Sequence, residues 1–403
     1  MSSAKVFPPG GPSAAGSRRG RRPGLLWFPA WALVAAQLVL LPTPSDAQVA
    51  ERRRVFEERR ENVYLIIPAV ASLPGVGLFV GVVSSFSNMG GTGIDAAVTV
   101  AESVEGSDIS AKALAVREIP LFIPGLSLEY QVADIKLGNF TTFLPGRNSP
   151  NFTIPFTGEF DVQVLAPSLR LFERRLNLTY RLAFFEGFSV TDDGTEVQQA
   201  SHGASGILLL DFTDDVIDPR RGFRIGYTTS LTAPENSLLG RNSEPVELLG
   251  EDKDIKVENY TLTFYFPFSE QLTLAWHNFY SLASGNEGSD QVVSGAAIPL
   301  RGYPGNRWRD RFGVFTGLEA RYTLPLNREI DFLLVHGLLE GIQFALFYEV
   351  GQVNPDDGSA LYDDLRNSYG VGIRALVEAI VLRLDVATSE EGPQFHLTID
   401  QPF

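Results

Sequence analysis

Hydrophobic and polar residues alternate along most of the chain after residue 62. Positions 176, 178, 180, 182 and 184 hold Leu, Leu, Tyr, Leu and Phe, while 177, 179 and 181 hold Asn, Thr and Arg. A period of two places successive side chains on opposite faces of a β-strand. The pattern recurs at 126–132, 317–324, 342–351 and 380–386, so the sequence predicts strands with one apolar and one polar face.

The length of these segments favours strands that cross a membrane. They run to roughly ten residues, which is what a tilted strand needs to span a bilayer. Strands of a soluble sandwich, the alternative for this pattern, usually have about five or six residues. Aromatic residues cluster toward segment ends, as in Phe264, Tyr265, Phe266 and Phe268, which suits interfacial girdles. The predicted fold class is therefore all-β, a transmembrane antiparallel β-barrel.

We expect about sixteen strands, an even number as in bacterial barrels. The long polar connections at 138–155 and 232–254 suit an external rim, and the short turns at 73–75 and 218–222 suit a periplasmic rim. The expected strands are 63–72, 77–86, 93–102, 107–119, 126–137, 156–165, 175–186, 205–213, 222–231, 257–268, 271–283, 312–324, 341–353, 368–377, 379–387 and 395–403.

The amino terminus has the order of a cleaved secretory signal. Four arginines between positions 18 and 22 precede an apolar run at 25–41, and Ser45-Asp46-Ala47 follows. As a transmembrane helix, the alternative, the run is short and contains Pro29. We expect a signal peptide at 1–47, a short periplasmic stub at 48–62 and the barrel at 63–403.

The charge narrows the choice of partners, and the absence of cysteine narrows the possible chemistry. Removing residues 1–47 takes away five of the 33 basic and one of the 48 acidic residues, which leaves 28 basic and 47 acidic side chains. This acidity disfavours nucleic acid as a partner. The chain has no Cys, which excludes disulfides, Cys-ligated zinc and thiol catalysis.

Five stretches carry a resemblance to a known family: 73–78 (LPGVGL), 211–223 (DFTDDVIDPRRGF), 300–303 (LRGY), 347–353 (FYEVGQV) and 401–403 (QPF). By their order and spacing, the chain resembles the bacterial surface-antigen superfamily of outer-membrane barrels, which includes BamA-like and TamA-like proteins. The resemblance spans essentially all of residues 63–403. It implies an outer membrane of the Gram-negative type as the location.

In this family an arginine-glycine-aromatic tip lies on a long external loop that folds back into the lumen. The resemblance therefore gives Arg301, Gly302 and Tyr303 the role of a loop-docking motif. The period of two independently points Glu319 and Glu349 into the lumen. A guanidinium that meets carboxylates in a confined site makes charge-assisted bonds, and a glycine allows the tight turn that aims the arginine. The family commonly has Asp where Glu349 stands.

Two further segments take roles from the resemblance. The expected periplasmic turn motif consists of Asp215, Pro219, Gly222 and Phe223. The expected carboxy-terminal assembly signal, which barrel-assembly machinery recognises by strand addition, consists of Phe395, Leu397, Ile399 and Phe403.

Related assembly proteins carry polypeptide-transport repeats before the barrel, whereas only 48–62 is available here, so the chain resembles a member without them. The expected partners are outer-membrane lipids, the barrel-assembly machinery and a separate periplasmic protein.

The sequence does not predict an enzyme, a cofactor or a metal site. No Gly-x-Ser-x-Gly elbow occurs, and no His pair has metal-ligand spacing. His277 points toward the lumen on an alternating strand, where a Ser-His arrangement is the catalytic alternative. We interpret it as a hydrogen-bonding residue of the lumen.

Two functions compete. The first is a barrel that assists the insertion or export of polypeptide, or of lipid, through a weak seam between the first and last strands; Pro68 removes a backbone donor from the first strand. The second is a passive channel or structural barrel without insertase activity, which the absence of the repeats favours. A barrel enzyme comes third.

Overall fold

The computed structural model describes residues 62–399 except for twelve gaps, so the expected signal peptide, nearly all of the stub and Phe403 lie outside the described residues. The gaps are 74–76, 105–108, 138–139, 144–145, 147–150, 155, 192–195, 240–244, 247–254, 285–295, 306 and 378–379.

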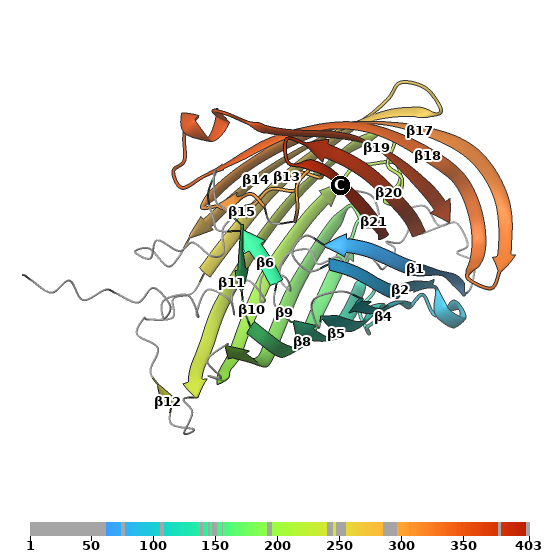
Figure 1. Ribbon diagram of the computed structural model, residues 1–403. Helices are drawn as coiled ribbons and strands as arrows, with labels where there is room; N and C mark the ends of the chain where they lie inside the picture. The colour runs from blue at the N-terminus through green and yellow to red at the C-terminus, as the bar shows by residue number, and fades with distance from the viewer. Residues whose placement is uncertain are drawn as a thin grey trace, which may run out of the picture.

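One antiparallel sheet of seventeen strands dominates the described residues, and one of these, β12 (Pro245–Val246), has only two residues. The sheet curls round until β21 lies beside β1 (Figure 1). It is a closed antiparallel barrel, which confirms the predicted fold class. The other sixteen strands are β1 (Val63–Leu73), β2 (Gly77–Ser87), β3 (Asp95–Ser103), β4 (Ser110–Pro120), β5 (Leu126–Leu137), β8 (Phe156–Leu171), β9 (Leu176–Thr191), β10 (Glu196–Asp211), β11 (Gly222–Leu239), β13 (Ile255–Pro267), β14 (Leu272–Ser284), β17 (Phe312–Phe332), β18 (Val335–Asn354), β19 (Arg366–Val377), β20 (Ile380–Ser389) and β21 (Gly392–Ile399).

Two small hairpins and two short 3-10 helices complete the described elements. The hairpins pair β6 (Phe140–Phe143) with β7 (Asn151–Ile154) and β15 (Ala296–Ala297) with β16 (Arg309–Asp310). The helices are η1 (Met89–Gly91) and η2 (Ser359–Tyr362). No helix in the described part of the chain is long and apolar enough to cross a membrane.

The barrel wall has apolar side chains on its outer face and polar side chains on its inner face, which is the reverse of the arrangement in a soluble protein. Leu178, Tyr180 and Phe184 on β9 are exposed on the outside, whereas the neighbouring Arg181 is only 6% exposed. The most deeply buried side chains include Glu319, Arg321, Glu349, Arg374 and Asp385. An apolar outer band around a polar interior is what a strand barrel in lipid requires.

The antiparallel order sorts the connections into two ends. The connections β2–β3, β4–β5, β8–β9, β10–β11, β13–β14, β17–β18 and β19–β20 lie at the end where β1 begins and β21 finishes, which we name the turn end. The opposite loop end carries the long connections such as 138–155 and 285–311. The β1–β2 turn also lies there, so its expected grouping with the turn at 218–222 is wrong. A chain that enters a barrel at one end makes its first turn at the other, however short that turn is.

Candidate functional site

The connection between β14 and β17 folds back into the barrel from the loop end. Its root is held by a buried apolar cluster that contains Ile298, Leu300, Tyr303 and Trp308 of the loop with Phe315 and Val353 of the wall. Trp308 is 2% exposed and meets Tyr303 edge to face at 5.3 Å. Burying this much aromatic surface fixes the loop against the inner face of β17 and β18.

Arg301 stands at the tip of this loop among three buried carboxylates. Its Nε donates to Glu349 Oε1 at 2.6 Å, and its Nη1 donates to Glu319 Oε2 at 2.9 Å and to Asp385 Oδ2 at 2.7 Å. The guanidinium lies 3.4 Å from the ring centre of Phe347, a cation–π contact. Burial by itself would lower the pKa of Arg301, but the three carboxylates raise it above its usual value, so the arginine stays charged.

Gly302 allows the tip to approach the wall closely. A Cβ there would lie 2.6 Å from both Ser368 Cβ and the carbonyl oxygen of Thr388. The Gly302 carbonyl accepts a hydrogen bond from Ser389 Oγ at 2.6 Å, and the Arg301 carbonyl meets His396 Nε2 at 2.7 Å. The sequence predicts a tight turn at this glycine, and Tyr303 N donates to the Leu300 carbonyl at 3.1 Å across Arg301 and Gly302. The structure adds a second reason, because no side chain fits between the loop and β19–β20.

The carboxylates around Arg301 have further cationic partners. Arg321 Nε lies 2.7 Å and Arg374 Nη2 lies 2.8 Å from Glu319 Oε1. Arg383 Nε lies 3.5 Å from Asp385 Oδ2.

Glu349 differs, because Arg301 is its one guanidinium partner among the described residues, and its other side-chain partner is Ser368 Oγ at 2.7 Å. Arg301 is therefore more important to Glu349 than to the other two acids.

Sequence reasoning did not select Asp385, Arg321 or Arg374 for this site. The alternation did place Asp385 and Arg383 on the inner face of their strand. It does not say how far adjacent strands are staggered, so it cannot tell which inward residues meet across three strands. Arg309, which lies in the same loop, is 3% exposed, and burial lowers the pKa of Arg309 to about 10.

At the turn end, the β10–β11 connection is a rigid turn that curls into the mouth of the barrel. Asp214 Oδ1 accepts hydrogen bonds from the backbone of Arg220 and Arg221, both at 3.0 Å, and Asp215 Oδ1 accepts one from Ile217 N at 2.7 Å. Ile217 is 3% exposed. Carboxylates that bind successive backbone donors hold a loop in one shape, so the expected turn motif at Asp215 is a structural cap.

The remaining residues of the turn motif close this turn. Gly222 has φ 111°, and a Cβ there would lie 2.2 Å from the carbonyl oxygen of Phe212. The ring of Phe223 lies 5.1 Å from that of Phe212, and Pro219 is buried. Only a glycine combines this φ with so close an approach.

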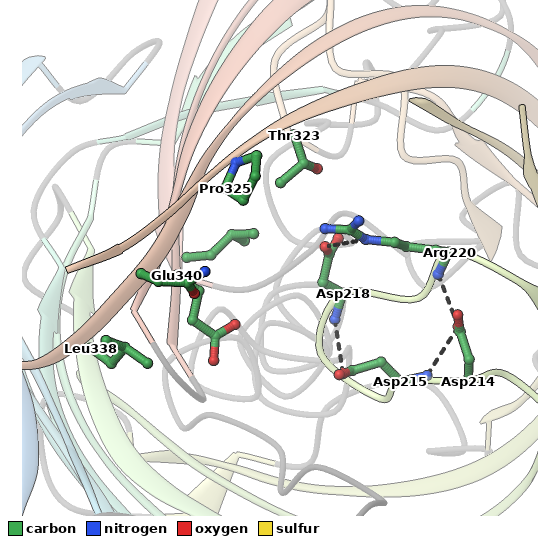
Figure 2. Close-up of a pocket in the computed structure, with 10 residues that line it drawn as sticks. Asp214, Asp215, Asp218, Arg220, Thr323, Pro325, Leu338 and Glu340 are labelled. Atoms are coloured by element: carbon green, nitrogen blue, oxygen red, sulfur yellow. Dashed lines mark hydrogen bonds and ion pairs between the residues drawn. The ribbon is translucent and has the colours of Figure 1, made fainter. Parts of the chain in front are cut away.

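A pocket of about 490 Å³ lies between this turn and the base of the β17–β18 hairpin (Figure 2). Asp218 and Arg220 face it from the turn, and Thr323, Pro325 and Glu340 face it from the hairpin. Asp218 Oδ1 accepts a hydrogen bond from Gln343 Nε2 at 3.0 Å, and Asp218 Oδ2 pairs with Arg220 Nε at 3.3 Å. The turn is thus bonded to the inner face of β18.

A chain of polar contacts connects the loop tip to the turn through the barrel. From Arg301 it passes through Glu319 to Arg374, whose Nη1 donates to Gln343 Oε1 at 2.9 Å, and from Gln343 to Asp218. The loop from one end and the turn from the other are therefore bonded to one set of lumen side chains.

The other sequence-selected residues lie apart from this network or at its edge. His277 Nδ1 shares a hydrogen bond with Thr263 Oγ1 at 2.7 Å. In the described ranges, no group of three or more His, Cys, Asp or Glu is arranged to hold a metal ion. Phe395 and Leu397 are exposed on β21, the backbone of Ile399 pairs with Leu382, and Phe403 lies outside the described residues.

Comparison with known proteins supports the fold. No family model and no curated protein matches the chain. CdiB from Acinetobacter baumannii (TM-score 0.49, 12% identity, 84% of this chain and 59% of that one) and BamA from Haemophilus ducreyi lacking POTRA domains 1-3 (0.49, 14%, 84% and 69%) align over most of the chain. CdiB from Escherichia coli aligns with a TM-score of 0.51 at 13% identity over 84% of this chain and 61% of CdiB. The chain spans less than two thirds of either CdiB protein, and it has the same β-barrel fold as CdiB.

Proposed function

We propose that the chain is an outer-membrane barrel that assists the insertion or export of polypeptide, or of lipid, through a seam between β1 and β21. The surface-antigen resemblance, the CdiB-like fold and the loop tip on its acidic partners support this proposal. Under it, residues 1–47 are removed on export, and a separate periplasmic protein is a partner of the barrel.

The observation that carries the proposal is the pairing at the seam. Between β1 and the described part of β21 there is no backbone ladder, although the strands lie side by side. Ladders of eight residue pairs join β20 to β21 and β2 to β3. Each backbone group that loses its partner in lipid costs several kcal/mol, so a seam with few pairs opens more easily than any other junction of the barrel.

A passive or structural barrel is the second candidate. The inward loop and the inward turn favour a structural barrel over an open channel, because both are bonded to the inner wall and reduce the space for a conducting path. The two candidates differ in whether the seam must open for activity.

A seam lock separates the two candidates. The chain has no Cys, so cysteines at Ile67 on β1 and Thr398 on β21 can be joined by a flexible thiol-reactive cross-linker after reconstitution in liposomes. We expect the cross-link to abolish assisted insertion of a barrel client. The matched control joins Ser85→Cys to Ala97→Cys, which are register partners on β2 and β3. If the seam-locked protein and the control are equally active, the passive barrel is the better account.

A further inference from the structure

The β17–β18 hairpin continues past the ends of the strands beside it. At the turn end, β17 pairs with β14 only as far as Tyr322, and β18 pairs with β19 only from Leu339. Residues 325–338 therefore form a two-stranded extension that neither β14 nor β19 flanks. Its register shifts between Pro325 and Arg328. Such a bulge bends a strand, and the extension curves away from the wall (Figure 1).

The extension curves back onto β1. Tyr64 pairs with His336 and Leu65 pairs with Val335 in an antiparallel register, and Ile66 N donates to the carbonyl oxygen of Leu334 at 2.8 Å. In sheet order β19, β20 and β21 lie between β18 and β1. The hairpin therefore crosses the ends of three strands and the seam to reach its partner.

Side chains support this backbone pairing. The rings of Tyr64 and His336 stack at 5.7 Å. Val335 packs on a buried apolar cluster formed by Val63, Leu65, Ile217, Leu376, Ile380 and Val381. An isolated two-stranded hairpin is marginally stable, so the extension depends on β1 and this cluster for its shape.

The pairing uses the edge of β1 that faces the seam. Backbone groups of alternate residues in a strand face the same neighbour. Because Ile66 N bonds to the hairpin, Tyr64, Ile66 and Pro68 all direct their backbone away from β2. The backbone groups of Tyr64 and Ile66 pair with the hairpin, and Pro68 has no N–H. The first six residues of β1 therefore have no free backbone N–H for β21.

We infer that residues 325–338 act as a clasp, which closes the seam at the turn end by holding β1 to β18 across β19, β20 and β21. Widening the seam at this end requires that the clasp first release β1. The inference concerns how the barrel stays closed, and it stands whether or not the barrel transports a client.

A disulfide tests the geometry of the clasp. Leu65→Cys and Val335→Cys occupy directly opposed positions of the register, where side chains are close enough to bridge. We expect this pair to oxidise in the membrane-inserted protein as completely as the control pair Glu329→Cys and Leu338→Cys, which are register partners within the hairpin. A folded barrel in which the control oxidises and the clasp pair does not would overturn the inference.

A distance measurement tests whether the clasp keeps the seam closed. Spin labels on cysteines at Val82 and Leu384, both exposed on the outside, report the separation of β2 and β20 across the seam. Val335→Asp places a carboxylate in the apolar cluster, and we expect it to shift the distance distribution to longer values. Leu333→Asp, at the 79% exposed tip of the same hairpin, should leave the distribution unchanged.

A second variant covers the case in which Val335→Asp does not fold. Ile66→Pro removes the donor to Leu334 on the seam side of β1 without placing a charge in the apolar cluster. Folding of each variant is checked by its compact band on unheated gels. Parent-like distances in whichever of these variants folds would overturn the clasp, since the seam would then be held by other contacts.

Discussion

Arg301 meets Glu349 through two hydrogen bonds, from its Nε to Oε1 at 2.6 Å and from its backbone N to Oε2 at 2.9 Å. Both oxygens of one carboxylate thus hold one residue of the loop, by its charge and by its backbone. The family that the chain resembles commonly has the shorter Asp at this place, and here the longer Glu reaches both donors. The contact fixes the position of the loop tip as well as its charge.

The first prediction concerns the loss of the arginine. Arg301→Ala should lower the free energy of unfolding by about 3 kcal/mol, because removing one partner of a shielded ion pair leaves the other buried and unpaired. Arg311→Ala, in the same loop beside Phe312, should change it by less than about 1 kcal/mol. The measurement is urea unfolding followed by gel mobility. Equal losses in the two variants would count against a docked loop.

The second prediction identifies which carboxylate is left unpaired. Glu319 and Asp385 keep other arginines when Arg301 is removed, whereas Glu349 keeps only Ser368. Glu349→Gln should therefore restore about 1 kcal/mol or more to the Arg301→Ala variant, and should destabilise the parent. The matched variant Glu319→Gln should not rescue. A double-mutant cycle with no coupling between 301 and 349 would contradict this account.

The fold could be predicted from the sequence because a barrel wall repeats one rule. Each strand alternates, as β9 does from Leu176 onward, and the number of strands follows from counting such segments. The alternation did not predict the lengths of β17 and β18. Strands were expected at 312–324 and 341–353, whereas β17 continues to Phe332 and β18 begins at Val335. The extension contacts β1 and an apolar cluster, and such contacts between distant segments leave no periodic signal.

The sequence likewise predicted only some of the residues of the candidate site. Arg301, Glu319 and Glu349 came from the motif and the inward face, and the structure brings them together. Asp385 shares the same inward face, but only the stagger of β20 against β17 and β18 places it beside Arg301. That stagger is fixed by closure of the whole barrel, which no local pattern records.

The third prediction tests the close approach at the loop tip. Gly302→Ala adds a Cβ 2.6 Å from Ser368 Cβ and the Thr388 carbonyl, and overpacking of this kind costs about 1 to 3 kcal/mol. Trypsin should then cleave after Arg301 about tenfold faster in the folded barrel. Gly305→Ala, where nothing lies within 4 Å, is the control and should behave as the parent. Equal cleavage of both variants would show that the tip is not packed on β19 and β20.

The fourth prediction separates steric approach from backbone strain at the turn end. Gly222 and Gly358 have similar positive φ values of 111° and 119°, but a Cβ at 222 would lie 2.2 Å from the Phe212 carbonyl while one at 358 meets nothing within 4 Å. Gly222→Ala should therefore destabilise the barrel by about 2 kcal/mol more than Gly358→Ala does, measured by urea unfolding. Similar losses of stability in the two variants would mean that the positive φ alone, and not the close approach to Phe212, determines the cost.

The last prediction concerns communication between the loop and the turn. Gln343 uses its amide on three partners: it donates to Asp218 Oδ1 and Thr323 Oγ1, both at 3.0 Å, and accepts from Arg374 Nη1 at 2.9 Å. Gln343→Leu keeps the volume but removes these bonds, which should cost about 1 to 3 kcal/mol.

In the parent, Arg301→Ala and Asp218→Asn should show an interaction energy of about 0.5 kcal/mol or more, because they lie in one bonded network. In the Gln343→Leu background that energy should vanish, since Gln343 joins Arg374 to the turn. Tyr348→Leu is the control, because Tyr348 lies on the same strand but is exposed on the outer face, and it should leave the interaction intact. Coupling that survives Gln343→Leu would mean that the loop and the turn communicate by another route, such as the backbone of β18 itself.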